Sequence, residues 1–136
     1  MREPVGLLLG IDLTEVGRVA AVLERHAERF LARVFREGEI RRARRHPRAF
    51  AEHVAGRFAA KEAAMKALGT GWRGVAFREI EIGRDPSGKP RLAFHGRALE
   101  RARQLRVLSA EVSITHARDL AAAVVALVTE PETPLR

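Results

Sequence analysis

The chain contains the run Arg57-Phe58-Ala59-Ala60-Lys61-Glu62-Ala63-Ala64-Met65-Lys66-Ala67-Leu68-Gly69-Thr70-Gly71, which is typical of a helix that ends in a glycine turn. Alanine, leucine, methionine, lysine and glutamate favour helices, and the glycine after Leu68 is a natural stop. Helical spacing puts Glu62 on the same stripe as Phe58 and Met65. A carboxylate on such a stripe is costly unless a cationic partner or a metal ion compensates its charge.

Two interpretations of Glu62 remain open. Lys66 follows it by four residues, so the two side chains can form an ordinary helix-stabilising pair worth about 0.2–0.5 kcal/mol. Alternatively, Arg57, Lys61 and Lys66 surround one acid that leans toward the core. That arrangement suits a divalent cation held together with a phosphorylated ligand.

The turn at residues 69–71 is not a P-loop, because its glycines follow the helix instead of preceding it. The turn lies at the negative end of the helix dipole, so a phosphate bound here depends on basic side chains or on turn amides. The residues that we expect to supply these contacts are Arg57, Lys61, Lys66, Gly69, Thr70 and Gly71.

Composition predicts one globular domain. The chain has 136 residues, of which 46% are hydrophobic, and this is enough for a core. It has no cysteine, which excludes disulfides, thiol catalysis and thiolate metal sites. No apolar run reaches the length of a membrane span and no signal-peptide pattern is present, so we expect a cytoplasmic protein without membrane association.

The net charge of +8 favours a polyanionic partner: a nucleic acid, an acidic protein or a phosphorylated substrate. Biased genome composition would explain the abundant arginine and alanine equally well. Aromatic residues make up only 5% of the chain and tyrosine is absent, so the stacking platforms of many single-strand binders are missing.

The order of predicted elements indicates a single α+β domain, with an N-terminal strand, several helices and a small, mostly antiparallel sheet. It occupies residues 1–129, followed by a flexible tail at 130–136. We predict strands at 5–13, 75–83, 91–95, 109–116 and 120–129, and helices at 16–35 (one or two), 36–48 (charged and exposed), 49–68 and 97–105.

Three further residues leave alternatives open. Asp12 ends a strand predicted to be buried, and it is either a helix cap or a ligand. Gly56 inside the long helix marks either a close approach by ligand or backbone or a packing contact. The run Ser113-Ile114-Thr115-His116, with Asp119 nearby, resembles a catalytic triad only superficially, because three members from seven consecutive residues rarely converge. A structural role or a phosphate contact suits His116 better.

Four motifs in this order resemble the holo-[acyl-carrier-protein] synthases, the short class of 4′-phosphopantetheinyl transferases. They are Gly10-Ile11-Asp12-Leu13, the long run from Arg57 to Gly71, Gly88-Lys89-Pro90 and Ser113-Ile114-Thr115-His116. The resemblance implies transfer of phosphopantetheine from coenzyme A to a serine of an apo acyl carrier protein, with release of adenosine 3′,5′-bisphosphate. It also implies a homotrimer with each site at a subunit interface.

The resemblance implies roles for individual residues. Asp12 and Glu62 bind Mg²⁺, Lys66 contacts phosphate and neutralises the leaving group, Arg57 and His116 lie near the 3′-phosphate, and the turn at Lys89 and Pro90 lies by the adenine. We expect the acidic carrier protein to meet Arg18, Arg25, Arg29 and Phe30 on the first helices.

Other readings stay open. Either Glu62 or a metal-bound water accepts the proton of the serine. Gly17 and Ala117 depart from the polar residues that relatives often have. We expect no nucleic-acid partner, but a small basic nucleic-acid-binding module and a catalytically silent interaction domain remain the alternatives. The sequence does not distinguish a fatty-acid carrier from a polyketide carrier.

Overall fold

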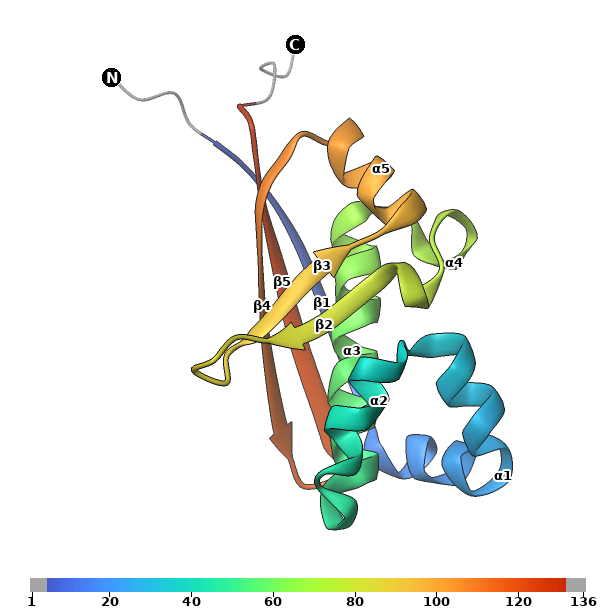
Figure 1. The fold of residues 1–136 in the computed structure, drawn as a ribbon. Coiled ribbons are helices and arrows are strands. Elements are labelled where there is room, and N and C mark those ends of the chain that lie inside the picture. The colour runs from blue at the N-terminus through green and yellow to red at the C-terminus, as the bar shows by residue number, and fades with distance from the viewer. Residues whose placement is uncertain (1–4, 132–136) are drawn as a thin grey trace.

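A three-stranded antiparallel sheet lies against one long helix in a computed structural model that describes residues 5–131, except the side chains of residues 72 and 73. The strand order is β1-β5-β4, and the helix α3 crosses one face of the sheet (Figure 1). These elements are β1 (Gly6–Glu15), α3 (Phe50–Leu68), β4 (Val107–Ala117) and β5 (Leu120–Thr129). The last residues of the predicted tail, 132–136, lie outside the described residues.

Alanine allows α3 to lie deep in the molecule. Ala55, Ala59, Ala60, Ala63 and Ala64 are all completely buried. Their small side chains let the sheet, the second hairpin and the N-terminal helices approach the helix from several sides. The prediction of a helix at 49–68 that stops at a glycine is therefore confirmed, with Gly69 in the left-handed conformation at its end.

The closest approach between sheet and helix is at Gly10. A Cβ atom on this residue would overlap the carbonyl oxygen of Ala63. Only glycine therefore fits at this crossing of β1 over α3.

The N-terminal strand is only half covered, so the prediction of a buried strand is wrong for one face. Asp12 and Thr14 face the helix and are buried. The alternate residues Leu7, Leu9, Ile11 and Leu13 are 58–66% exposed. In a single chain nothing within the described residues covers that outer face, because the sheet has its helix on one side only (Figure 1).

A two-stranded hairpin closes the other side of α3. It pairs β2 (Ile80–Arg84) with β3 (Pro90–Phe94), and α5 (Gly96–Gln104) follows. The strand predicted at 75–83 starts later than expected, because the Glu79 carboxylate accepts a hydrogen bond from the Ala76 amide and holds a helical turn there. Ile80 and Ile82 are fully used in the core.

The N-terminal helices form a second, smaller layer beside α3 (Figure 1). The prediction of one or two helices at 16–35 is confirmed by a single element that kinks at His26. These elements are α1 (Val16–Val34), α2 (Glu37–Arg44) and the 3-10 turn η1 (Pro47–Ala49), whereas the short α4 (Gly71–Gly74) follows α3. Across the part of the chain that is described, no helix combines the length and apolarity needed to span a membrane.

Candidate active site

Asp12 and Lys66 meet where β1 crosses α3. The Lys66 ammonium donates to Asp12 Oδ1 at 3.1 Å and to the Ile11 carbonyl oxygen at 3.0 Å. Asp12 Oδ2 accepts a further hydrogen bond from the Thr14 hydroxyl. Asp12 points into the helix contact and does not cap α1, whose N-cap is Glu15. The helix-cap interpretation of Asp12 is therefore wrong.

Glu62 lies one helical turn before Lys66 and beside Asp12. Its burial, followed by the charge of Asp12 and a hydrogen bond with it, raises the pKa of Glu62 to about 7, although Lys66 opposes this rise. Two carboxylates thus share one lysine, which leaves the cluster short of positive charge. Such a pair can hold a proton or a cation.

The cluster offers a metal ion two protein ligands only. No group of three or more His, Cys, Asp or Glu side chains is arranged to hold a metal ion within residues 5–131. A pair of carboxylates nevertheless matches the chemistry of Mg²⁺, which is bound in many sites by one or two carboxylates together with substrate phosphates and water. The donor set therefore fits a magnesium ion shared with a phosphorylated substrate.

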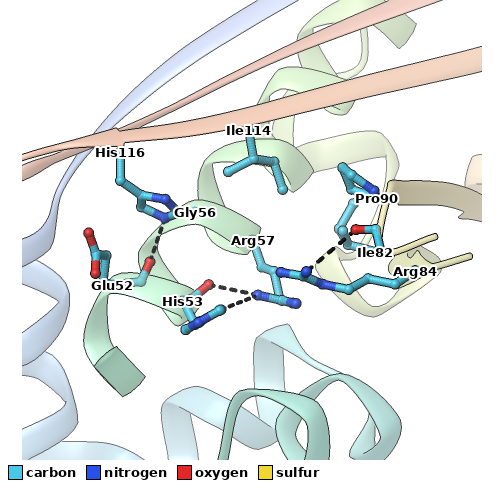
Figure 2. A pocket seen from close by; sticks show the side chains of 10 residues that line it. Glu52, His53, Gly56, Arg57, Ile82, Arg84, Pro90, Ile114 and His116 are labelled. Atoms are coloured by element: carbon cyan, nitrogen blue, oxygen red, sulfur yellow. Dashed lines mark hydrogen bonds between the residues drawn. The ribbon is translucent and has the colours of Figure 1, made fainter. Parts of the chain in front are cut away.

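A pocket of about 380 Å³ opens on the hairpin side of α3, and Figure 2 shows it from close by. It gathers three predicted site residues from three separate elements: Arg57 from α3, Pro90 from β3 and His116 from β4. The other residues that line it are Glu52, His53, Gly56, Ile82, Arg84, Gly88 and Ile114.

Arg57 is the buried cation of this pocket. It is only 5% exposed, and its Nε atom has no hydrogen-bond partner within the described chain. Burial, followed by the nearby charges of Arg84 and Arg42, lowers the pKa of Arg57 to about 10, so it stays positively charged at neutral pH. A buried, incompletely paired guanidinium beside a second arginine favours an anionic ligand.

His116 packs across α3 at Gly56. A Cβ atom on Gly56 would lie 2.7 Å from His116 Nε2, so a side-chain packing contact explains this glycine. His116 Nε2 lies 3.0 Å from the carbonyl oxygen of Glu52 (Figure 2). Ser113 and His116 lie on opposite faces of β4, because side chains alternate along a strand, and this agrees with the rejection of a triad.

Lys61 requires a correction, because it cannot contact coenzyme A. Its ammonium is completely buried and donates to Glu39 Oε1 at 2.9 Å and to the carbonyl oxygens of Phe77 and Ile80. Glu39 is also buried, and its Oε2 accepts from the Ile82 amide. The helix predicted at 36–48 to be exposed therefore has one buried charged residue, Glu39.

The remaining predicted contacts are dispersed. Gly69, Thr70 and Gly71 lie at the far end of α3, where Arg101 donates to the Leu68 carbonyl oxygen. Lys89 is next to the pocket-lining Pro90 but pairs with Glu111 at 2.9 Å. The pocket residues that the sequence reasoning missed are His53 and Arg84. His53 lies four residues before Arg57, one helical turn away, and this spacing could have revealed it.

A second pocket of about 300 Å³ adjoins the carboxylates on the side of α1. Of the predicted carrier-binding residues it contains Arg18 and Phe30, together with Glu62. Arg25 and Arg29 are exposed on the same helix but do not line this pocket. One side of Glu62 is thus open toward α1.

A family model described as the 4′-phosphopantetheinyl transferase superfamily matches residues 8–125. The chain belongs to this superfamily. The matched range contains Asp12, Arg57, Glu62, Lys66 and His116. Membership makes the chain a transferase.

Relatives within the phosphopantetheinyl transferases cover almost the whole chain. The holo-[acyl-carrier-protein] synthase of Solidesulfovibrio magneticus is 52% identical over 120 residues, 88% of this chain and 95% of that protein. The synthase of Maridesulfovibrio salexigens is 49% identical over 121 residues, 88% of this chain and 95% of that protein.

Solved structures of this transferase family share the fold. A crystal structure of holo-(acyl-carrier-protein) synthase from Bacillus anthracis in complex with CoA (3′,5′-ADP) aligns with a TM-score of 0.76 and 33% identity, covering 93% of this chain and all of that one. The Helicobacter pylori synthase in complex with coenzyme A aligns with a TM-score of 0.78 and 29% identity over 88% of this chain and 99% of that one.

Proposed function

We propose that the protein catalyses Mg²⁺-dependent transfer of 4′-phosphopantetheine from coenzyme A to a serine of apo acyl carrier protein, with release of adenosine 3′,5′-bisphosphate. The observation that carries this proposal is the convergence of Asp12, Glu62 and Lys66 at one crossing of strand and helix. The superfamily and the curated names of the relatives support it. These findings favour an enzyme over a nucleic-acid module or a silent interaction domain.

Asp12 and Glu62 are the residues that would hold Mg²⁺. When bound, the ion supplies positive charge that neutralises the pyrophosphate of coenzyme A. The unbalanced charge of the two carboxylates supports this assignment, since Glu62 is costly to keep ionised beside Asp12.

The transfer needs positioning and charge neutralisation more than covalent chemistry from the protein. The serine oxygen forms a bond to the phosphorus of the phosphopantetheine, and the bond from that phosphorus to the bridging oxygen breaks. The electron pair leaves with adenosine 3′,5′-bisphosphate, whose charge Lys66 offsets. In this proposal a carboxylate oxygen of Glu62 takes the serine proton.

The pocket around Arg57 and His116 would hold the 3′-phosphate half of coenzyme A. Its depth, its buried guanidinium and the second arginine at position 84 support an anionic ligand. Pro90 supplies apolar surface at the rim for the adenine. Lys89 would contact the nucleotide only after leaving Glu111.

The carrier protein would approach along α1. Arg18 and Phe30 line the pocket next to Glu62, and Arg25 and Arg29 extend the positive surface along the helix. An acidic carrier would be steered to this surface by charge, with Phe30 as an apolar contact next to the reacting serine.

A homotrimer is part of the same proposal. The outer face of the sheet exposes apolar side chains that a single chain leaves in water, which favours self-association. They are Leu7, Leu9, Ile11, Leu13, Leu108, Leu120 and Val124. The strand predicted at 75–83 contributes nothing to this surface, because Ile80 and Ile82 are buried.

Mass spectrometry of an apo acyl carrier protein, incubated with the enzyme, coenzyme A and Mg²⁺, tests the proposal. We expect the carrier mass to increase by one phosphopantetheine group at its serine, and EDTA to stop the increase. A carrier in which that serine is alanine is the matched control. An unchanged mass, with an apo carrier that a known transferase modifies, would refute the proposed activity.

A further inference from the structure

Two histidines, His53 and His116, line the pocket together with Arg57 (Figure 2), and a third, His46, lies against His53. The His53 and His46 rings stack with centroids 4.6 Å apart, and the His116 ring lies 6.5 Å from that of His53. Arg57 Nη1 lies 3.1 Å from His53 Nδ1 and 3.4 Å from the His53 carbonyl oxygen. His53 is therefore the neighbour that holds the guanidinium by both side chain and main chain.

The chemistry of the two groups fixes the direction of the side-chain hydrogen bond. A guanidinium carries only donors, so Nδ1 of His53 must be the acceptor. The imidazole is then neutral, with its proton on Nε2. Protonation of His53 would place a second donor against the guanidinium and break this contact.

This bond matters because Arg57 has few other restraints. Its Nε atom has no hydrogen-bond partner among the described residues, and the residue is only 5% exposed. A buried arginine without a fixed orientation could turn its charge away from the pocket. His53 supplies the side-chain acceptor that prevents this.

We propose that His53 is a positioning residue of the nucleotide pocket, where its neutral imidazole orients Arg57 toward the 3′-phosphate of the substrate. The inference rests on the proposed function and assigns to that site a residue and a protonation requirement. His53 acts through Arg57 and does not itself contact the phosphate.

The surroundings of His53 keep it neutral near physiological pH. Burial comes first and then the positive charge of Arg57, followed by His46, Arg84 and His116, and together they lower the pKa of His53. These groups come from α3, from the segment before η1, from the end of β2 and from β4. Acidification would thus remove the acceptor only below the ordinary range of histidine.

Three variants separate an acceptor from a stacked ring. In His53→Asn the amide oxygen can take the place of Nδ1, whereas His53→Leu keeps bulk and loses the acceptor. His46→Ala removes the stacked ring and leaves the acceptor. Calorimetry with adenosine 3′,5′-bisphosphate should show about tenfold weaker binding for His53→Leu, and binding within about threefold of wild type for the other two.

A steady-state readout distinguishes positioning from loss of structure. His53→Leu should raise the KM for coenzyme A about tenfold at nearly unchanged kcat, with an unchanged melting temperature. Equal weakening in His53→Leu and His53→Asn, or the largest effect in His46→Ala, would overturn the proposal.

The pH dependence gives a sharper comparison. Below the ordinary range of histidine, down to about pH 4.5, the ratio of the wild-type Kd to the His53→Asn Kd should rise above its value at about pH 7.5, because only the wild type loses its acceptor by protonation. Titration of the ligand phosphates affects both proteins and cancels in the ratio. A ratio that is flat or falls on acidification would contradict the protonation requirement.

Nitrogen-detected NMR of the protein without ligand tests the geometry independently of the proposed function. At pH 7.5 His53 should be neutral with its proton on Nε2, and His53→Asn should leave the signals of the Arg57 guanidinium near their wild-type positions. A proton on Nδ1 would overturn the inference even if the transferase activity is confirmed. Absence of any nucleotide binding together with the expected tautomer would instead refute the proposed function.

Discussion

Lys61 and Lys66 lie five residues apart on α3, and each contacts a carboxylate at about the same distance. Lys61 lies 2.9 Å from Glu39, and both side chains are 0% exposed. Lys66 lies 3.1 Å from Asp12, and its side chain is 57% exposed. The two pairs differ in whether every charged group has a partner. Two backbone carbonyl oxygens take the remaining protons of Lys61, whereas a second carboxylate, Glu62, stands beside the Lys66 pair without a full partner.

A buried ion pair whose hydrogen bonds are all satisfied cannot bind a ligand, but it contributes strongly to the stability of the fold. Removing one member strands the other charge in the interior, which costs about 3–5 kcal/mol. A partly exposed pair with a second carboxylate beside it behaves in the opposite way, because removing one of two repelling carboxylates relieves their repulsion. The pair that contributes most to stability should thus contribute least to catalysis, and the reverse.

The largest effect is expected for Lys61→Met. This change leaves Glu39 buried without its cation and should lower the free energy of unfolding by about 3–5 kcal/mol. The double variant Lys61→Met/Glu39→Gln should recover part of that loss, because no charge remains buried. Urea denaturation measures both. A stable Lys61→Met protein with greatly reduced kcat would break the comparison, since it would place Lys61 in the chemistry.

Asp12→Ala and Glu62→Ala should show the opposite behaviour, with a large loss of activity and no loss of stability. We expect turnover to fall by about a hundredfold or more, because the substrate pyrophosphate loses its neutralisation, while the melting temperature stays at or above that of wild type. In the presence of coenzyme A we expect Mg²⁺ to raise the melting temperature of the wild type, and each variant should lose this rise.

Carrier-modification assays and thermal melts on the two carboxylate variants provide the measurements. Should Asp12→Ala instead cost about 0.5–2 kcal/mol and stay active, it would behave like a lost cap or local bond. Substantial activity in either variant would remove that residue from the site.

The protonation of Lys61 sharpens the comparison further. Burial lowers the pKa of Lys61 to about 8, and Glu39 offsets this only in part. In the unfolded chain the pKa returns to about 10.5, so between these values the unfolded state binds more protons than the folded state. The free energy of unfolding should therefore rise with pH from about 8 to about 10.5.

The double variant Lys61→Met/Glu39→Gln is the reference for this experiment, because it lacks both titrating groups. Urea denaturation of both proteins at several pH values gives the difference in their free energies of unfolding. If that difference falls across the window, the carboxylate and carbonyl oxygens around Lys61 outweigh its burial.

The smallest effect is expected at Arg18, on the open side of Glu62. Arg18→Glu should raise the KM for the carrier protein about tenfold and that for coenzyme A far less, since an exposed charge acts mainly on encounter. Raising the salt concentration should weaken the wild type and reduce the difference between the two proteins. Steady-state kinetics at low and high salt measure this. Equal changes in both KM values would remove Arg18 from the carrier surface.

The sequence predicted the elements that depend on local patterns. The long alanine-rich helix, its glycine stop and the hairpin at residues 85–90 follow from propensity and turn chemistry, and the structure confirms them. The prediction that Asp12 lies near Glu62 rested on the family resemblance of the ordered motifs, because no periodicity relates residues 50 positions apart.

The failures share a physical cause, which is contact between distant segments. Lys61 and Lys66 belong to one basic flank in the sequence, and only the position of Glu39, 22 residues earlier on a different helix, separates their roles. The spacing of His53 and Arg57 is local, but only the packing of β4 and the hairpin against α3 shows that this pair lines a pocket. The outer face of β1 was misjudged because an apolar run does not tell which side of a sheet is covered.

Gly10 determines how closely β1 approaches α3 at the site. The carboxylates of Asp12 and Glu62 reach each other only as long as β1 lies directly against the Ala63 carbonyl. The absence of a side chain at Gly10 therefore sets the distance between the two carboxylates. A methyl group inserted there would pry the strand off the helix and widen the gap, without touching a charged atom. Random mutation could thus inactivate the protein at a position with no polar group at all, and Gly10 limits how far its neighbours can drift.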